Sequence, residues 1–288
     1  MTERKHIPSQ DLGLELGLLF ARHLVGTEDL HYGLWAPGLP VKLANMPRAQ
    51  AAHTQLVIDN IPQDVRRILD VGCGAGVIGE QLVQRGYTVD CVGPEGRLLA
   101  RARDRLDGRA SVHAARFQDF RTDDKFDLIL FSESFQYVPL EDALPRCESM
   151  LRPGGYILIC DFFKQPGRHG APIGGGHRLQ VFRDLVQSRG LNVVTDLDIT
   201  AQTAPNADLA DDFLREVGKP AYELVDAFAR ESWPLATRVS RWFMRKRLRK
   251  LEDKYFSGRR NAAVFAEFKS YRLVLLQRPV AAHAAAKG

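Results

Sequence analysis

The chain has 288 residues, of which 45% are hydrophobic and 26% are charged, so it is long enough for one large globular domain, alone or with a sizeable insertion. Seven of the positive charges behind its net +5 lie in the acid-free segment Arg238–Lys250, and this local patch argues against a general nucleic-acid-binding protein. A polar N-terminus and the lack of any apolar run near the roughly 18 residues of a membrane span argue against a secretory leader and a transmembrane helix, and predict a cytoplasmic protein.

The first predicted element is a helix over residues 9–26, with Ser9 as its cap. From Val65 to about Asp161, short apolar β-branched runs alternate with helical patterns; the strand-like runs are RRILDVG, YTVDCVG, SVHAARF, FDLILFS and GYILICDFF. Strands that are apolar along their whole length, with helices between them, predict a parallel sheet covered on both faces. The cysteines have no CxxC pairing, so we expect reduced, packed thiols. They are Cys73, Cys91, Cys147 and Cys160.

The pattern then adds a helix, RLQVFRDLVQSRG, and a strand, LNVVTDLDIT. About 60 residues of helical pattern follow, from Pro205 to Arg260, before a last strand, FKSYRLVLLQRP. An amphipathic face is predicted inside this region, because apolar residues recur there at i, i+4, i+7 and i+11. They are Met244, Leu248, Leu251 and Tyr255.

The run ILDVGCGAGVIG places Asp70, Gly72, Gly74 and Gly76 between a strand and a helix. Glycines let the backbone turn sharply and approach a ligand closely, and the helix N-terminus offers free N–H groups. Dinucleotide-binding folds use a similar spacing. The acid that leads into the loop nevertheless favours an α-amino group over a pyrophosphate. Neither FDLILFSESFQYV nor LRPGGYILICDFF has a counterpart in the dinucleotide fingerprint.

Taken together, the DxGxGxG loop, FDLIL and LRPGGYILI make the chain resemble the class I S-adenosylmethionine-dependent methyltransferases, over roughly residues 15–200 and again at the final strand. The segment LHYGLW is similar to an aromatic-rich segment of members that act on tocopherols, phosphoethanolamine, sterols or fatty acyl chains. The resemblance implies an α/β, Rossmann-like sheet of seven mostly parallel strands, with helices on both faces and an antiparallel last strand. It also implies S-adenosylmethionine as cofactor and S-adenosylhomocysteine as product.

On this basis the chain divides into five parts. We expect an N-terminal helical lid segment (1–60), a Rossmann-like cofactor-binding core (61–203), a helical substrate-lid insertion (204–262), a final core strand (263–280) and a disordered tail (281–288).

The resemblance also implies where the cofactor binds. Asp70 and the glycine backbone would hold the methionine part, and Tyr32 and Trp35 are candidate lid residues whose aromatic faces suit a sulfonium cation. The alternatives are that Asp70 caps a helix and that both aromatics belong to the core. The full predicted set is Tyr32, Trp35, Asp70, Gly72, Cys73, Gly74, Gly76, Gly93, Pro94, Glu95, Arg116, Phe117 and Ser132.

Two positions depart from the family's pattern. Gly93 stands where the family has an acid that accepts both ribose hydroxyls, and charge-assisted bonds of this kind contribute about 1.5–3 kcal/mol each. Glu95, two residues further on, is a possible substitute. Arg116 stands where the family usually has an aspartate that binds the adenine amino group, and Phe117 is expected against the adenine face.

Candidates for the acceptor side come from the end of the fourth strand and from the loop after the fifth. FSESFQYV offers Glu133 and Tyr137 as polar liners. His177 follows the triplet Gly174–Gly176, where a glycine hinge would present it as a general base. A non-catalytic role at a helix start is the alternative for His177, and His31 is a rival base.

The helical insertion is expected to form a substrate lid. Its aromatic and aliphatic residues suit an apolar pocket, although helix packing needs the same residue types. The basic run Arg238–Lys250 is a solvated helix face, or a docking surface for an acyl-carrier protein, a coenzyme A thioester or an anionic membrane, or least favoured an RNA contact. The residues expected to form the pocket are Phe213, Phe228, Trp233, Trp242, Phe243 and Met244.

The sequence therefore predicts methyl transfer from S-adenosylmethionine to an oxygen or carbon of a small hydrophobic metabolite, such as a lipid, isoprenoid or polyketide-like compound, without a metal. The departures at Gly93 and Arg116 keep open a non-catalytic binding protein with the same fold. An RNA methyltransferase is the remaining alternative.

Overall fold

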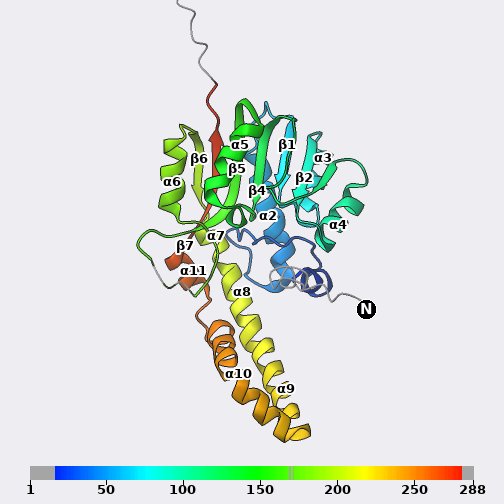
Figure 1. Ribbon diagram of the computed structural model, residues 1–288, viewed down its shortest axis with the longest axis vertical. Helices are drawn as coiled ribbons and strands as arrows, with labels where there is room; N and C mark the ends of the chain where they lie inside the picture. Colours follow the sequence, from blue (N-terminus) through cyan, green and yellow to red (C-terminus); the bar gives the residue numbers. More distant parts are fainter. Residues whose placement is uncertain (1–16, 169, 171, 281–288) are drawn as a thin grey trace, which may run out of the picture.

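A computed structural model describes residues 17–168, 170 and 172–280, which form a sheet flanked by helices with a helical hairpin at one end (Figure 1). Within these residues, seven strands form one sheet in the order β3–β2–β1–β4–β5–β7–β6. β7 is antiparallel to β5 and β6, whereas the other neighbours are parallel, so the predicted fold is confirmed. The strands are β1 (Arg67–Val71), β2 (Thr88–Gly93), β3 (Ser111–Ala114), β4 (Phe126–Ser132), β5 (Leu151–Lys164), β6 (Asn192–Asp198) and β7 (Lys269–Gln277).

Helices cover both faces of the sheet and bury two apolar clusters. One cluster joins the sheet to α2, α3 and α4, and the other joins it to α5 and α6. These helices are α2 (Met46–Asp59), α3 (Val77–Gln84), α4 (Arg97–Leu106), α5 (Leu140–Met150) and α6 (Leu179–Ser188).

The central strands carry apolar residues on both of their faces because both faces are covered. Neighbouring residues of a strand point to opposite faces. Ile68 and Leu69 of β1 are both fully buried, the first in the cluster with α2 to α4 and the second in the cluster with α5 and α6. Leu128 and Ile129 of β4 divide in the same way. The continuous apolar runs in the sequence thus reflect a two-sided core.

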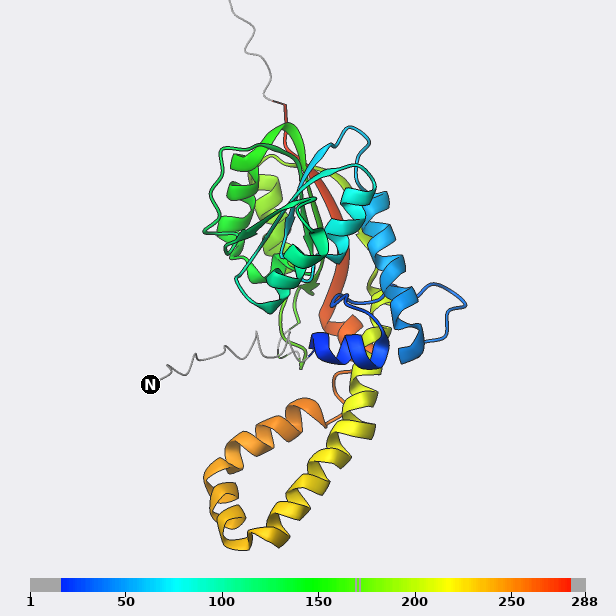
Figure 2. The same ribbon diagram turned by 90° about the vertical axis from the view of Figure 1, so that its right-hand side faces the viewer.

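The insertion before β7 is helical, as the sequence predicts. After α7 (Thr200–Thr203), α8 (Pro205–Phe213) continues through η4 (Leu214–Gly218) into α9 (Lys219–Ser232), and α10 (Pro234–Tyr255) runs back towards α11 (Ala262–Phe268). Figure 2 shows α9 and α10 extending away from the sheet as a hairpin. We call residues 214–255 the helical arm. No side chain of α9 is buried, and none of the described side chains of α10 is.

The remaining short elements are η1 (Ala21–Val25), η2 (Leu43–Asn45) and η3 (Phe135–Tyr137). Residues 17–20 are helical and lead into η1, in agreement with part of the predicted helix; its cap Ser9 and the tail 281–288 lie outside the described residues. All four cysteines are buried and free, as predicted. Among the described helices, none is long and apolar enough to cross a membrane.

Candidate active site

The glycine loop connects β1 to α3 and has one packed side and one open side. Gly72, Gly74 and Gly76 have φ angles of +75°, +56° and +79°, a region that favours glycine. A Cβ on Gly72 would lie 2.4 Å from the Cβ of Ser134, whereas no heavy atom lies within 4 Å of a Cβ placed on Gly74. A ligand can therefore approach the loop backbone and the first N–H groups of α3 from the side of Gly74.

The carboxylate of Asp70 lies at the end of β1 and is 2% exposed. Its Oδ2 atom has no hydrogen-bond partner among the described residues. Burial raises the pKa of Asp70 to about 7. Gly76 is the N-cap of α3 and no side chain makes a capping hydrogen bond there, so Asp70 does not cap this helix. An unpartnered, buried carboxylate oxygen beside a glycine loop suits a bound cationic group such as an α-amino group.

Gly93 ends β2 where the family's ribose-binding acid is missing. A Cβ there would lie 3.4 Å from Leu99 Cδ1 and 3.9 Å from the Sγ atom of Cys73, so the position has room for a Cβ. Glu95, the predicted substitute, pairs through both carboxylate oxygens with Arg103, and its side chain is 65% exposed. The neighbouring Pro94 is exposed. In this arrangement Glu95 faces Arg103 and solvent.

The adenine end of the predicted site differs from expectation. Arg116 is exposed after β3. Phe117 is only 3% exposed, and its ring meets that of Phe131 edge-on with the centroids 5.2 Å apart. Phe117 belongs to the apolar cluster under α5 and α6, so it offers no open face to a ligand here.

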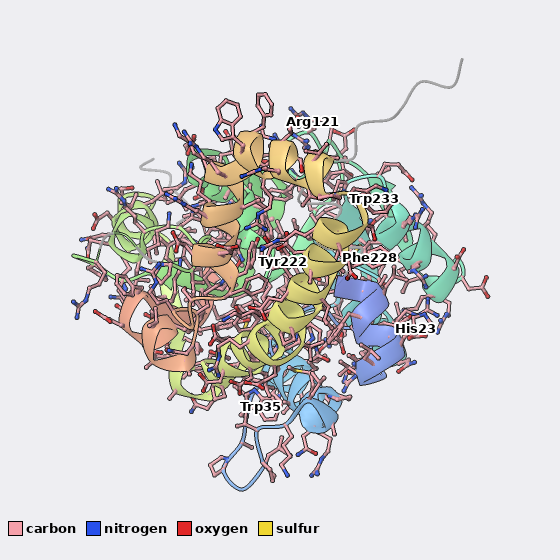
Figure 3. All side chains as sticks on the ribbon, turned by 90° about the horizontal axis from the view of Figure 1, so that it is seen from below. His23, Trp35, Arg121, Tyr222, Phe228 and Trp233 are labelled. Carbon is pink, nitrogen blue, oxygen red and sulfur yellow. The ribbon has the colours of Figure 1, made fainter. Side chains whose placement is uncertain are left out.

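Of the two predicted lid aromatics, only Tyr32 reaches the end of β4. Its backbone N–H donates to Oε1 of Glu133, and its ring packs against Phe162 with the centroids 6.1 Å apart. Trp35 is 5% exposed, and its backbone N–H donates to the carbonyl of Gln202. Trp35 lies at the base of the loop that precedes α2 (Figure 3). It is therefore a core aromatic that joins the N-terminal segment to the start of the helical insertion.

Glu133 follows β4 directly and has a φ of +52°, which side-chain-bearing residues rarely adopt. Its N–H donates to the carbonyl of Cys160, and its Oε1 accepts from the Tyr32 N–H and, at 2.7 Å, from the Tyr271 hydroxyl. Burial raises the pKa of Glu133, although the nearby His31 and these two donors oppose the rise. Both hydrogen bonds end on Oε1, so Oε2 is left for a ligand.

A buried polar chain continues from Tyr271 to α2. The Tyr271 Oη lies 3.0 Å from Nε2 of His53, and the Cys160 Sγ lies 3.3 Å from the same nitrogen. Because the Tyr271 hydroxyl donates its one hydrogen to Glu133, it accepts from His53, which places the His53 hydrogen on Nε2. Burial and the charge of His31 lower the pKa of His53 well below its usual range, so His53 is neutral.

His31 holds the N-terminal segment against α2. Its ring stacks on that of His53 with the centroids 4.5 Å apart. Its Nδ1 lies 2.9 Å from the Tyr32 carbonyl, and its Nε2 lies 3.0 Å from the Thr54 hydroxyl and 3.3 Å from the Asp29 carboxylate. Burial lowers the pKa of His31, but the hydrogen bond and charge of Asp29 and further acceptors outweigh it and raise the pKa overall.

The loop after β4 is fixed by Asp161 of β5. The carboxylate accepts from the Gln136 N–H at 3.0 Å and from the Gln136 side chain at 3.1 Å. Burial and the charge of Glu133 raise the pKa of Asp161 to about 8. The Gln136 Oε1 accepts from the Gly176 N–H, and the buried Lys269 donates to the carbonyl of Gly174. The glycine triplet is therefore held from both sides, whereas the sequence predicts a hinge there.

His177 lies at the same loop but is occupied by backbone contacts. Its Nε2 is 3.1 Å from the Phe135 carbonyl and 3.0 Å from the Val138 carbonyl. Carbonyl oxygens only accept, so Nε2 carries the hydrogen, and in the neutral ring Nδ1 is the nitrogen left to take a proton. The two backbone contacts give His177 a structural role, and its role as a general base stays a prediction. Tyr137 is 56% exposed, and the buried Ser132 Oγ has no partner among the described residues.

Sequence reasoning did not identify the buried polar residues grouped around Glu133. Tyr271 comes from β7, His53 from α2 and Asp161 from β5, far from Glu133 along the chain. The available signal was polarity inside apolar elements: Asp161 is the one acid in the β5 run LRPGGYILICDFFK. Among the described residues, no three or more His, Cys, Asp or Glu side chains are grouped as a metal site.

The glycine loop and Glu133 are adjacent because Ser134, the residue after Glu133, packs against the loop. The Ser134 hydroxyl donates to the carbonyl of Val71, and its Cβ fills the space that a side chain on Gly72 would need. A ligand on the loop and a second molecule at Glu133 would therefore meet at one edge, the carboxyl ends of β1 and β4.

Comparisons with known proteins agree with this architecture. The model of a methyltransferase domain family matches residues 68–155. A ubiquinone biosynthesis O-methyltransferase of Bordetella avium is 28% identical over 109 residues, which cover 35% of this chain and 44% of that protein. The matched part thus spans less than half the length of this curated relative.

Two solved structures show the same fold over nearly the whole chain. A geranyl diphosphate C-methyltransferase from Streptomyces coelicolor A3(2), in complex with Mg²⁺, geranyl-S-thiolodiphosphate and S-adenosyl-L-homocysteine, has a TM-score of 0.64 at 17% identity, covering 90% of this chain and 91% of that one. The [4+2]-cyclase SpnF has a TM-score of 0.66 at 16% identity, covering 95% and 98%.

The sheet order, the glycine loop and these similarities define the class I S-adenosylmethionine-dependent methyltransferase fold. Within it, residues 68–155 are the part of the chain that matches the methyltransferase domain family.

Proposed function

We propose that the protein transfers a methyl group from S-adenosylmethionine to an oxygen or carbon atom of a small, largely apolar metabolite. The observation that carries the proposal is the adjacency of the glycine loop and Glu133, locked together by Ser134. The cofactor would supply an electrophilic methyl group on a sulfonium, and the chain would align the acceptor and manage its proton.

The residues at the loop fit this cofactor. Asp70 has an unpartnered, buried oxygen for an α-amino group, and the space over Gly74 is open to a methionine moiety. Gly93 would leave the ribose with fewer charge-assisted bonds than in most relatives, so we expect weaker binding rather than none. Micromolar affinity is the expected range.

Glu133 would act on the acceptor. Its carboxylate is oriented by the Tyr271 hydroxyl and the Tyr32 N–H, and burial makes it more basic than an exposed glutamate. An acidic hydroxyl or an activated carbon placed against Oε2 would give up its proton there. The rings of Tyr32, Phe162, Phe265 and Tyr271 pack together beside this carboxylate and favour an apolar acceptor.

The relatives leave the acceptor atom open. One is named for O-methylation in ubiquinone biosynthesis and the other for C-methylation of geranyl diphosphate. Contact with an acyl-carrier protein or an anionic membrane through Arg238–Lys250 would bring such a substrate to the protein.

A second candidate is a protein of this fold that does not transfer methyl groups. Gly93 and Arg116 at the nucleoside end favour it, and the similar SpnF is named as a cyclase. An RNA methyltransferase is not favoured by any specific observation at the site.

Calorimetry with S-adenosylmethionine and S-adenosylhomocysteine separates these functions. The wild type is expected to bind both, and Asp70→Ala to lose affinity at least tenfold; the exposed Asp119→Ala is the control. Turnover against hydrophobic phenols and acyl acceptors then tests methyl transfer. No binding of either ligand would reject the proposal, and binding without turnover on any acceptor would favour the non-catalytic alternative.

A further inference from the structure

The helical arm exposes more apolar surface than its own folding requires. Large hydrophobic side chains between residues 224 and 244 are 45–78% exposed, although such side chains stabilise a fold only when they are buried. Figure 3 labels two of them, Phe228 and Trp233, where α9 meets α10. The expected apolar pocket is therefore not enclosed here. The exposed side chains are Leu224, Val225, Phe228, Trp233, Leu235, Val239, Trp242, Phe243 and Met244.

The exposed residues of α10 are ordered along its outward face. The inward face lines a cavity of about 230 Å³ between α9 and α10 and includes Met244 and Leu248. The outward face begins with Val239 and Phe243 near the turn and continues at helical spacing with Lys246 and Lys250 nearer the core. At 1.5 Å per residue, the apolar and basic parts of this face are separated by about 10 Å.

The basic residues of this helix are mostly without counterions. Arg241 pairs with Asp226 of α9, and the Arg245 guanidinium lies 5.9 Å from the Trp242 ring centroid. Within the described part of the chain, none of the other basic side chains of the segment Arg238–Lys250 forms an ion pair. An apolar tip followed by unpaired cations has the composition of a helix that lies at a membrane interface.

The helical arm lies at the same edge of the sheet as the candidate active site. It continues from α8, where the Asn206 side chain accepts from the Gly33 N–H and donates to the Gly33 carbonyl. The preceding residue, Tyr32, donates to Glu133 of the candidate active site. The arm and the site therefore share the carboxyl edge of the sheet.

We propose that the tip of the helical arm inserts into an anionic membrane surface, with Phe228, Trp233, Leu235 and Phe243 among the acyl chains and Lys246 and Lys250 at the phosphates. The inference deepens the proposed function, because it names the surface from which an apolar acceptor would be taken. Membrane binding itself requires neither cofactor nor methyl transfer, so each can fail alone.

A second copy of the chain is a poorer occupant of this surface. A two-fold interface would place the same patch, with its unpaired cations, on both sides. Anionic lipid headgroups neutralise these cations, whereas the acyl region accepts the aromatic tip.

The test is flotation of the full chain with two kinds of vesicle. One contains phosphatidylcholine alone, and the other also contains about 30% phosphatidylglycerol, which gives a strong negative surface potential. Binding is expected with the anionic vesicles and is expected to fall at least tenfold in the double variant Phe243→Ser/Trp242→Ser. Lys246→Glu/Lys250→Glu should weaken it at least tenfold as well. The controls are Val181→Ser and Lys125→Glu, which change exposed residues on the body of the molecule.

Each result decides the proposal. Retained binding in both arm variants, or equal binding to the neutral vesicles, would overturn it. So would concentration-dependent dimerisation that the Phe243→Ser/Trp242→Ser variant abolishes, or tighter binding to an RNA oligonucleotide than to the vesicles. Urea denaturation of the same variants checks that they are folded, and because it needs no cofactor it keeps this outcome separate from that of the proposed function.

Discussion

The carboxyl edge of the sheet and the helical arm use similar residue types in opposite ways. At the edge, Tyr271, Glu133 and Asp161 are held by specific hydrogen bonds, and aromatic rings such as Phe162 are buried beside them. In the arm, aromatic and charged side chains are exposed, Phe243 at 74% among them, and most of the basic ones on α10 have no ionic partner among the described residues. Packing accounts for the first set. It does not account for the second, which points to a binding partner as the reason for these residues.

The largest expected effect lies at the glycine loop. Gly72→Ala forces a side chain into a backbone with φ +75° and places its Cβ 2.4 Å from that of Ser134. We expect a loss of about 3–5 kcal/mol in the free energy of unfolding, from strain and overpacking together. Urea denaturation measures it. Gly86→Ala is the matched control, because Gly86 has a φ of +87° but no heavy atom lies within 4 Å of a Cβ added there. Backbone strain alone should lower the free energy of unfolding of this variant by about 1 kcal/mol.

Glu133→Gln is expected to lower kcat by roughly 10²–10⁴-fold if Glu133 takes the acceptor's proton, with cofactor affinity unchanged. Tyr271→Phe should act more weakly and shift the acid limb of the kcat/KM profile to higher pH, because it removes a donor that lowers the pKa of Glu133. Steady-state kinetics across pH measures both. The exposed Glu141→Gln is the control, and an unshifted profile in Tyr271→Phe would contradict the assigned hydrogen bond.

Asp70→Asn should stabilise the fold while weakening cofactor binding. The pKa of Asp70 is about 7 in the folded state and near 3.8 in the unfolded state. Between about pH 4 and pH 7 the folded state therefore holds a proton that the unfolded state has lost, so stability falls as the pH rises through this range. Asparagine removes this loss, so its advantage should grow over the same range to an upper bound of about 4 kcal/mol. Denaturation at pH 4, 6 and 8 tests it; an advantage that is flat with pH would show that Asp70 titrates normally.

Gly93→Asp should tighten S-adenosylmethionine binding about tenfold or more by restoring acceptors for the ribose, and each such bond contributes about 1.5–3 kcal/mol. The site has room for the Cβ. Calorimetry measures the change, with Gly96→Asp as a control for added charge in the same turn. Lost binding would mean that the ribose lies elsewhere.

The smallest effect is expected in the arm. Phe243→Ala should change the free energy of unfolding by no more than about 0.5 kcal/mol, because the side chain is 74% exposed. Phe163→Ala, at 1% exposed, should cost about 3–5 kcal/mol. Denaturation of the two variants compares the regions directly. A large loss at Phe243 would mean that the arm packs against the body of the molecule in solution.

The sheet, its helices and the glycine loop could be predicted from the sequence because their signals are local. Apolar runs mark the strands, and the spacing of Gly72, Gly74 and Gly76 follows from a turn that needs positive φ. The helical insertion was predictable for the same reason, but its extension away from the sheet was not, since periodicity gives a helix and not its direction.

The site was less predictable because its contacts join distant parts of the chain. Glu133 was found from its place after a strand, but Tyr271 is 138 residues further on and nothing local connects the two. His177 and Phe117 illustrate the same limit. Residue type and motif position suggested a base and an adenine contact, whereas the directions of their side chains depend on loops and clusters that only the folded chain specifies.

The position of β7 has a consequence for how the site is assembled. Among the described residues β7 is the last strand along the sequence, yet it lies between β5 and β6, so the sheet cannot be completed until residue 277 is available. The whole arm is synthesised in the interval during which β6 has no neighbour in the sheet. Because Tyr271 belongs to β7, the carboxylate of Glu133 gains its hydroxyl partner only after residue 271 has been synthesised. Chains truncated before β7 would keep the glycine loop but have an open sheet edge and an incomplete site, which makes them targets for aggregation and quality control rather than partly active enzymes.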